Sequence, residues 1–202
     1  DFTANNISTT DSLKDTPTNN FCTLNAIQGV YSATGTNTYS EGNLKVVTPN
    51  SGTGNVFGNM SFTSGKWYAE FTIVDKYTTN HINVGINPLN KQSTPLQSSS
   101  ASGHYYNSEG QFWNASSYSS GSYASYDDGD VIGIAVNFDT NRIYYYKNGT
   151  EVDYTNLNSN ITTHGFQYAV APYSQNVNKI SCNFGQRPFL YPVSGYKAVC
   201  TQ

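Results

Sequence analysis

The sequence is poor in charge and has no long apolar run. Only 11% of the 202 residues are Asp, Glu, Lys or Arg, against roughly 25% in a typical soluble domain. The ten Lys and Arg residues are scattered and the net charge is -3, so we expect no nucleic acid bound through its phosphates. No apolar run approaches the roughly 18 residues of a membrane-spanning helix, so we expect no membrane insertion.

Cysteine is also scarce, with Cys22, Cys182 and Cys200 only. Three cysteines are too few for a disulfide framework, and their spacing matches no metal site. We interpret them as buried or half-buried thiols, with a Cys22–Cys200 disulfide joining the two ends as the alternative. The three histidines lie far apart and show no metal or catalytic pattern. The sequence therefore predicts no metal and no cofactor.

Asn, Ser, Thr, Gly and Tyr take the place of charge, and the chain has 17 Tyr and 10 Phe. This composition disfavours helix and suits strands joined by turns. Residues 65–74, "GKWYAEFTIV", alternate between apolar and polar positions, which predicts a half-buried strand. No window of twelve or more residues shows helical periodicity.

The strongest local pattern is "GDVIGIAVNFDTNRIYYYKNG" at residues 129–149. Its first half is apolar on both faces, which predicts a central strand covered on both sides. A turn at residues 139–142 and a tight turn at Asn148-Gly149 follow. Further short strands are predicted around 21–27, 44–48, 81–88, 165–174 and 179–186, with a hairpin at 103–114. The fold class is therefore all-β, a two-sheet antiparallel sandwich.

The length favours a single domain. Residues 1–20 are polar and aperiodic, and we expect an arm or surface loop there, with one domain over 21–202. No signal peptide is visible and the first residue is not Met, which we interpret as a fragment or a processed or trimmed chain.

Four stretches in order resemble a SPRY domain, a bent antiparallel sandwich of the concanavalin A-like kind. They are "GKWYAEFTI", "VGI" at 84–86, "GDVIGIAVNFDTNRIYYYKNG" and "CNFGQRPF" at 182–189. The resemblance covers roughly residues 60–190. It implies a binding module that is not an enzyme, in which loops at one end of the sandwich recognise a partner.

The flanks resemble a narrower group. "DTPTNNFCTLNAI" at 15–27 and "NFGQRPFLYPVSGYKAVCT" at 183–201 are similar to SPRY-type modules of bacteriophage and prophage virion proteins, notably tail-fibre-like ones. This resemblance implies an extracellular virion protein that attaches to a host-surface glycan or protein. It also implies neighbouring virion subunits and a homo-oligomeric setting, where many copies give avidity.

Residues 105–126 are crowded with aromatic side chains, which give a large contact area at low entropic cost. The ligand-binding candidates are Tyr105, Trp113, Tyr118 and Tyr123. The alternative is core packing, because one of each neighbouring pair in a strand points inward. Either Tyr105 or Tyr106, and either Phe112 or Trp113, is expected in the core, whereas Tyr118 and Tyr123 sit among Ser and Gly.

The acidic run Asp127, Asp128 and Asp130 suits either a calcium site or an acidic turn whose carboxylates bond backbone amides, and we favour the turn. We expect Arg187 to tie the last strand to the N-terminal arm. Two alternatives to attachment stay open. One is a structural subunit of a virion, filament or appendage, and the other is a glycan-degrading enzyme with two carboxylates about 5–10 Å apart.

Overall fold

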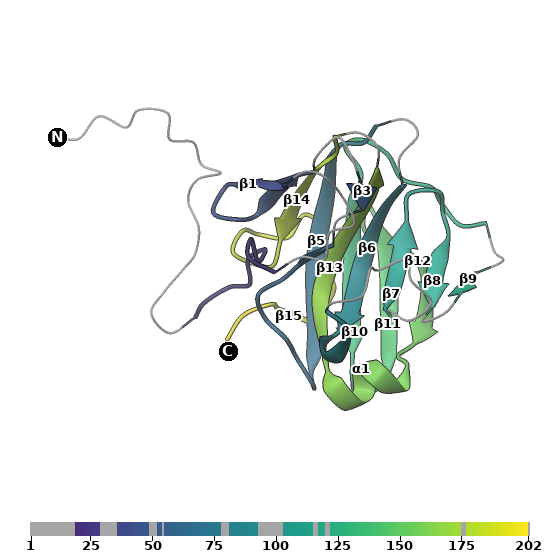
Figure 1. The fold of residues 1–202 in the computed structure, drawn as a ribbon. Coiled ribbons are helices and arrows are strands. Elements are labelled where there is room, and N and C mark those ends of the chain that lie inside the picture. The colour runs from purple at the N-terminus through teal and green to yellow at the C-terminus, as the bar shows by residue number, and fades with distance from the viewer. Residues whose placement is uncertain are drawn as a thin grey trace.

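The computed structural model describes residues 19–28, 36–48, 52–53, 55–77, 81–92, 103–114, 117–119, 122–174 and 177–201. These residues form a sandwich of two β-sheets with antiparallel main pairings, so the predicted fold class is confirmed (Figure 1). Helix in this described part of the chain is limited to α1 (Ser159–His164) and a short 3-10 turn, η2 (Leu89–Lys91). Within the described residues, no helix has the length and apolar content needed to cross a bilayer.

The first sheet contains the signature hairpin of the sequence. Its strand order is β1 (Thr38–Ser40), β2 (Lys45–Val47), β14 (Lys179–Asn183), β5 (Lys66–Asp75), β10 (Val131–Asn137), β11 (Arg142–Lys147) and β12 (Thr150–Asn156), with β15 (Lys197–Ala198) beside β5. All seven residues of β10 are buried, which confirms the predicted central strand. The turn after β10 has Asn141 at a positive φ of 52°.

The second sheet packs against the first. Its order is β3 (Gly52–Thr53), β13 (Phe166–Ser174), β6 (His81–Pro88), β7 (His104–Asn107), β8 (Phe112–Asn114) and β9 (Ser117–Tyr118), with β4 (Val56–Phe57) beside β13. The predicted hairpin at 103–114 is confirmed as β7 and β8. The core lies between the sheets, where Phe71, Ile134 and Tyr168 have exposed fractions of 0–1%.

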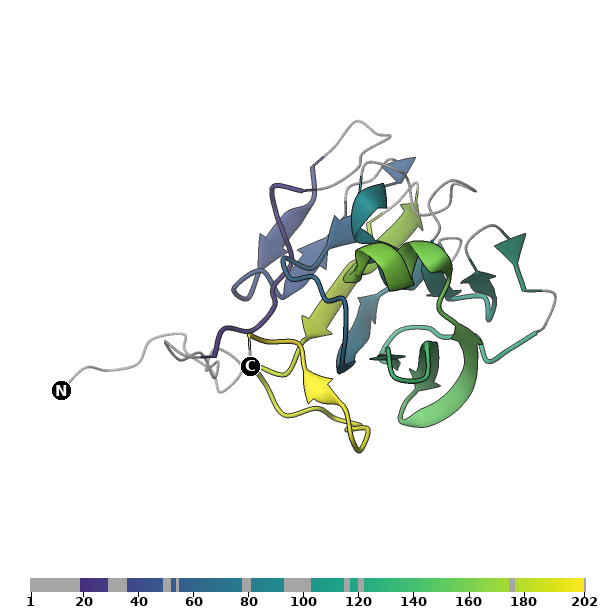
Figure 2. The ribbon, with the colours of Figure 1, turned by 90° about the horizontal axis from the view of Figure 1, so that it is seen from below.

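The prediction that β5 is half-buried is wrong, because its second face is also covered. Tyr68 and Glu70 on that face are only 1% and 2% exposed. The C-terminal tail, residues 189–198, covers them, and β15 pairs with β5 in parallel (Figure 2). The Leu190 N–H donates to Glu70 Oε2 (2.9 Å) and the Tyr191 N–H donates to Glu70 Oε1 (2.7 Å). A buried carboxylate therefore holds the tail on the sheet.

The described N-terminal segment packs on the same domain. The Cys22 N–H donates to the Val199 carbonyl (2.8 Å), and Phe21 lies opposite Cys200 in an isolated bridge. All three cysteines are buried and free, so the alternative of a Cys22–Cys200 disulfide is wrong. The register explains this, because neighbouring side chains in an extended segment point to opposite sides. Of the expected arm, only residues 19 and 20 are described.

The expected link from Arg187 to the arm stays a prediction, since only residues 19 and 20 of the arm are described, and its neighbour Gln186 contacts the segment that follows the arm. Gln186 Nε2 donates to the Cys22 carbonyl (3.4 Å). The guanidinium of Arg187 instead forms an ion pair with Glu41 (3.1 Å), in the turn between β1 and β2. The segment that follows β14 therefore contacts two separate parts of the N-terminal half.

Candidate functional site

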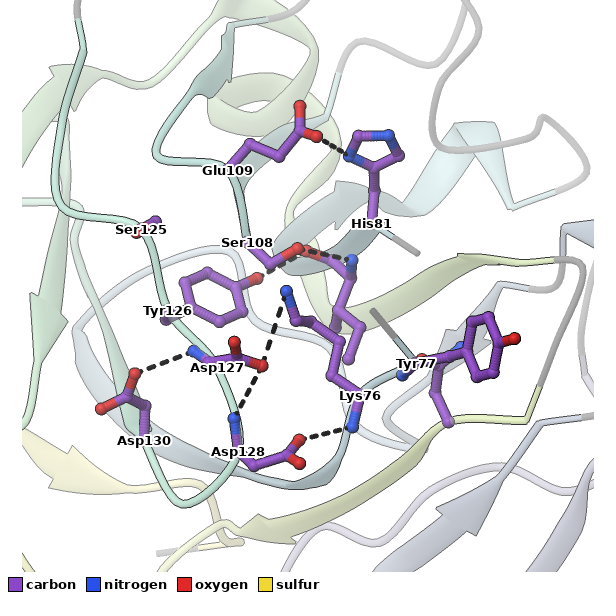
Figure 3. Close-up of polar contacts among 12 residues, drawn as sticks. Lys76, Tyr77, His81, Ser108, Glu109, Ser125, Tyr126, Asp127, Asp128 and Asp130 are labelled. Atoms are coloured by element: carbon purple, nitrogen blue, oxygen red, sulfur yellow. Dashed lines mark hydrogen bonds and ion pairs between the residues drawn. The ribbon is translucent and has the colours of Figure 1, made fainter. Parts of the chain in front are cut away.

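One end of the sandwich gathers the described parts of the connections β5–β6, β7–β8, β9–β10, β11–β12 and β13–β14. We call this surface the loop end. Its residues include Lys76, Tyr77, His81, Ser108, Glu109 and Ser125–Asp130 (Figure 3), with Asn148, which bonds Asp130, and Val177, next to the Tyr77 partner Asn178. Helix α1 lies at the opposite end of the sandwich (Figure 1).

Tyr126 anchors the β9–β10 connection to the second sheet. Its side chain is 1% exposed, and its hydroxyl lies 2.6 Å from the Ile82 carbonyl and 3.0 Å from the Tyr106 carbonyl. Burial raises the pKa of this phenol well above its usual value. The Tyr126 N–H donates to the Ser108 carbonyl (3.1 Å), and Ser108 Oγ accepts from the Ile82 N–H (3.2 Å). The β7–β8 and β9–β10 connections are thus joined to strand β6 around one buried ring.

The acidic run forms a hydrogen-bonded turn, as predicted. Asp128 Oδ1 accepts from the Lys76 N–H (2.6 Å), Asp127 Oδ1 from the Asp128 N–H (3.0 Å), and Asp130 Oδ2 from the Asp127 N–H (2.8 Å). The ammonium of Lys76 lies 3.5 Å from Asp127, and that of Lys147 lies 3.0 Å from Asp130. Among the described residues, no group of His, Cys, Asp and Glu is arranged to hold a metal ion.

The "GD" and "KNG" motifs meet at this turn. Asn148 Nδ2 donates to Asp130 Oδ1 (2.7 Å), and Asn148 Oδ1 accepts from the Val131 N–H (2.8 Å). Burial raises the pKa of Asp130, but hydrogen bonds from the Asp127 N–H, Asn148 and Lys147 outweigh it, so its pKa lies below the usual value. The two motifs therefore stiffen the loop end.

The loop end exposes an aromatic ring and an aliphatic side chain beside charged pairs. Tyr77 is 46% exposed and Val177 is 40% exposed. Figure 3 shows Tyr77 pointing away from the acidic turn, and its N–H donates to Asn178 Oδ1 (3.2 Å). His81 Nδ1 lies 3.2 Å from Glu109 Oε1 on the same surface. Exposed aromatic and apolar side chains on the same surface as charged pairs are typical of protein recognition surfaces.

The sequence-predicted aromatic residues lie mainly on another surface, the outer face of the second sheet. Tyr106 and Phe112 face the core, as the alternation predicts, and their rings stack at 4.7 Å. Tyr105 and Trp113 face the opposite way, yet they are only 1% and 8% exposed and belong to a second buried cluster. Tyr118, on the same face, is exposed and packs edge-on against Trp113 at 4.8 Å.

Tyr123 does not join the other three candidates. It is half-buried on the core side, edge-on against Phe112 at 4.4 Å. The structure therefore brings Tyr105, Trp113 and Tyr118 together and separates them from Tyr123. The burial of Tyr105 and Trp113 counts against contact with a ligand, and the binding role of all four residues stays a prediction.

The sequence did not indicate Tyr77 or Val177 as candidate binding residues. Each lies in a polar connection at a strand end, Tyr77 after β5 and Val177 before β14. The only sequence signal was an apolar or aromatic residue isolated between Thr, Asn and Lys.

Comparison with known proteins identifies the family to which this fold corresponds. The family model described as "SPRY domain" matches residues 66–187. The SPRY domain of human HERC1 superposes with a TM-score of 0.67 at 18% identity, over 82% of this chain and 99% of that domain. The E3 ubiquitin-protein ligase RKP of Arabidopsis thaliana is 33% identical over 69 residues, which is 34% of this chain and 5% of that ligase.

The matched segment starts at β5 and ends just past β14, so it includes the "GD" and "KNG" motifs that meet at the loop end. It covers well over half of the 202 residues. This chain belongs to the SPRY domain family.

Proposed function

We propose that this domain binds a protein partner through the loop end and performs no catalysis. SPRY domains serve as protein-interaction modules, which supports binding as the general role. The observation that carries the proposal is the exposure of Tyr77 and Val177 on the same surface as the hydrogen-bonded acidic turn. A partner that covers these side chains would gain apolar burial.

The chemistry of the loop end suits a protein better than a small ligand. Tyr is among the residues that carry binding energy at protein interfaces, and it is best placed inside a ring of polar contacts. Polar groups on the same surface are the His81–Glu109 pair and the Lys76–Asp127 ion pair. Exposed pairs of this kind add selectivity more than affinity.

The state of the carboxylates supports a role without catalysis. Glu70, the buried acid among the described residues, accepts two backbone N–H groups of the tail. Glu109 faces His81, and Glu151 accepts from the Tyr146 hydroxyl (3.3 Å). A glycan-degrading site would need a pair of carboxyl groups facing one groove.

The setting that we propose is the surface of a phage-like virion, with a host-surface protein as the partner and many copies of the domain acting together. Avidity would then compensate for modest affinity at each site. The support for this setting is the resemblance of residues 15–27 and 183–201 to virion modules. The two relatives named above come from a plant and from human, so the virion setting rests on that resemblance alone.

The test uses the domain displayed as a streptavidin tetramer and a panel of bacterial strains. We expect binding to at least one strain, its loss after proteolysis of the cell surface, and a drop of about tenfold or more with Tyr77→Ala. Tyr118→Ala is the matched control, because it removes an exposed ring of similar accessibility outside the loop end.

Two results would overturn the proposal. Binding that Tyr118→Ala abolishes and Tyr77→Ala leaves intact would move the site to the outer face of the second sheet. Absence of binding to every strain, by a tetramer whose circular dichroism shows a folded domain, would favour the structural-subunit alternative.

A further inference from the structure

A group of tyrosines on the outer face of the first sheet takes no part in the loop-end contacts described above. We call it the tyrosine face, and it consists of Tyr144, Tyr146, Tyr154, Tyr191 and Tyr196. The first three come from β11 and β12, and the last two come from the C-terminal tail. Tyr154 is 45% exposed and Tyr191 is 38% exposed, and the other three are not fully buried.

The strand register brings these rings onto one surface. Tyr144 lies opposite Tyr154 on β12 and opposite Ala135 on β10, and Tyr146 lies opposite Gly133. Directly opposed residues share one face of a sheet. The Tyr144 and Tyr154 rings are 5.5 Å apart and tilted by 38°. The space over Gly133 is filled by Tyr68, whose ring lies edge-on to that of Tyr146 at 6.3 Å.

Contacts with neighbouring groups hold the two exposed rings in place. The guanidinium carbon of Arg142 lies 4.4 Å from the centre of the Tyr154 ring. The Tyr191 ring lies over Gly149, since a Cβ atom there would come within 2.7 Å of Tyr191 Cδ1. The Tyr191 backbone is itself fixed through Glu70. Binding through these rings would cost little side-chain entropy.

Two hydroxyl groups of this face, those of Tyr146 and Tyr196, lie near one carboxylate, Glu151. The Tyr146 hydroxyl donates to Glu151 Oε2 (3.3 Å). The pKa of Tyr196 lies above its usual value. Burial and the nearby Tyr144 and Glu151 raise it, and a hydrogen bond with Asn137 opposes them. The pKa of Tyr146 is raised by burial, then by Glu151 and Tyr196. The face therefore offers flat rings beside a cluster of hydroxyl and carboxylate groups.

The balance of charge selects the class of ligand. The charged groups on and beside this face balance, with the cations Arg142 and Lys66 against the carboxylates Glu151 and Asp139. A face with no excess of either sign has no preference for an anionic or a cationic partner. Phenol rings cover the C–H face of a sugar, and their hydroxyls with Glu151 and Arg142 match its hydroxyl groups.

We propose that the tyrosine face binds a neutral oligosaccharide, with sugar rings packed on Tyr154 and Tyr191 and sugar hydroxyls bonded to Glu151. This site borders the loop end at the β11–β12 turn, where Tyr191 lies over Gly149, and uses other side chains. The two proposals stand or fall independently, because their key side chains differ.

The test is binding of the streptavidin-displayed domain to immobilised neutral oligosaccharides: maltose-, cellulose-, laminarin-, xylan-, mannan- and chitin-type chains. We expect one class to bind, with a loss of about tenfold or more for Tyr154→Ala. Tyr154→Phe keeps the ring and should bind within about twofold of the wild type. Tyr77→Ala is the matched control, since it removes an equally exposed tyrosine at the loop end.

Three results would overturn the proposal. The first is no binding to any class by a domain whose thermal unfolding matches that of the wild type. The second is binding that Tyr77→Ala removes and Tyr154→Ala does not, which would place sugar recognition at the loop end. The third is equal loss in Tyr154→Phe and Tyr154→Ala, which would exclude ring packing as the cause.

Discussion

Acidification should destabilise this domain through a single buried histidine. His104 at the start of β7 is 0% exposed, and its Nε2 accepts from the Asn158 N–H at the start of α1 (3.2 Å). Burial lowers the pKa of His104 from 6.5 to about 4. Protonation of Nε2 would remove this hydrogen bond and place a charge in the core.

The magnitude follows from proton linkage. The unfolded chain binds a proton near pH 6.5 and the folded chain near pH 4, so the stability held by neutral His104 is fully present above pH 6.5. It is lost progressively as the pH falls from 6.5 toward 4. At pH 5 the loss amounts to about 2 kcal/mol, because each pH step below the unfolded pKa costs about 1.4 kcal/mol.

The assay is urea unfolding at pH 7 and pH 5, followed by tryptophan fluorescence. The wild type should lose about 2 kcal/mol of unfolding free energy between these pH values. His104→Gln keeps an acceptor but cannot be protonated, so its stability should be lower at pH 7 and nearly flat with pH. His164→Gln, at an exposed position, is the control and should retain the wild-type slope. An equal slope in His104→Gln and wild type would refute the reasoning.

Three further predictions concern stability, the loop end and the thiols. Glu70→Ala should cost about 3 kcal/mol in chemical denaturation, since two buried N–H groups lose a charged acceptor; a change under about 0.5 kcal/mol would contradict this role. Asp130→Ala should speed amide hydrogen exchange in residues 125–130 while β10 stays protected, and unchanged exchange would mean that Asp130 does not stiffen the turn. Burial raises the pKa of Cys22 to about 12, so Cys22 should react with a thiol reagent only after unfolding, and rapid labelling of the native domain would argue against it.

Local sequence patterns predicted the strands well where each one is defined by its own side chains. The alternation in residues 65–74 placed β5, and the run apolar on both faces identified β10 as central. The acidic turn was also predictable, because Asp side chains bond nearby backbone amides whatever the fold around them.

Local sequence patterns could not predict what covers the outer face of each sheet. The alternation predicts that Glu70 faces solvent. In the structure, the tail at Leu190, far away in the chain, covers it. Tyr105 and Trp113 alternate correctly with the core residues, yet burial on the outer face removes them from solvent. Period-two alternation says which side a residue faces and does not say what covers that side.

The all-β class, the central hairpin and the turn chemistry follow from local sequence, since they depend on neighbours within about ten residues. Which tyrosines are exposed depends on contacts between distant segments. The tertiary structure places Tyr77 beside Asn178 and the Tyr191 ring over Gly149, contacts between segments far apart in the chain. Such contacts form because burying distant apolar and polar groups together offsets the entropy of closing long loops, and no short stretch of sequence records that balance.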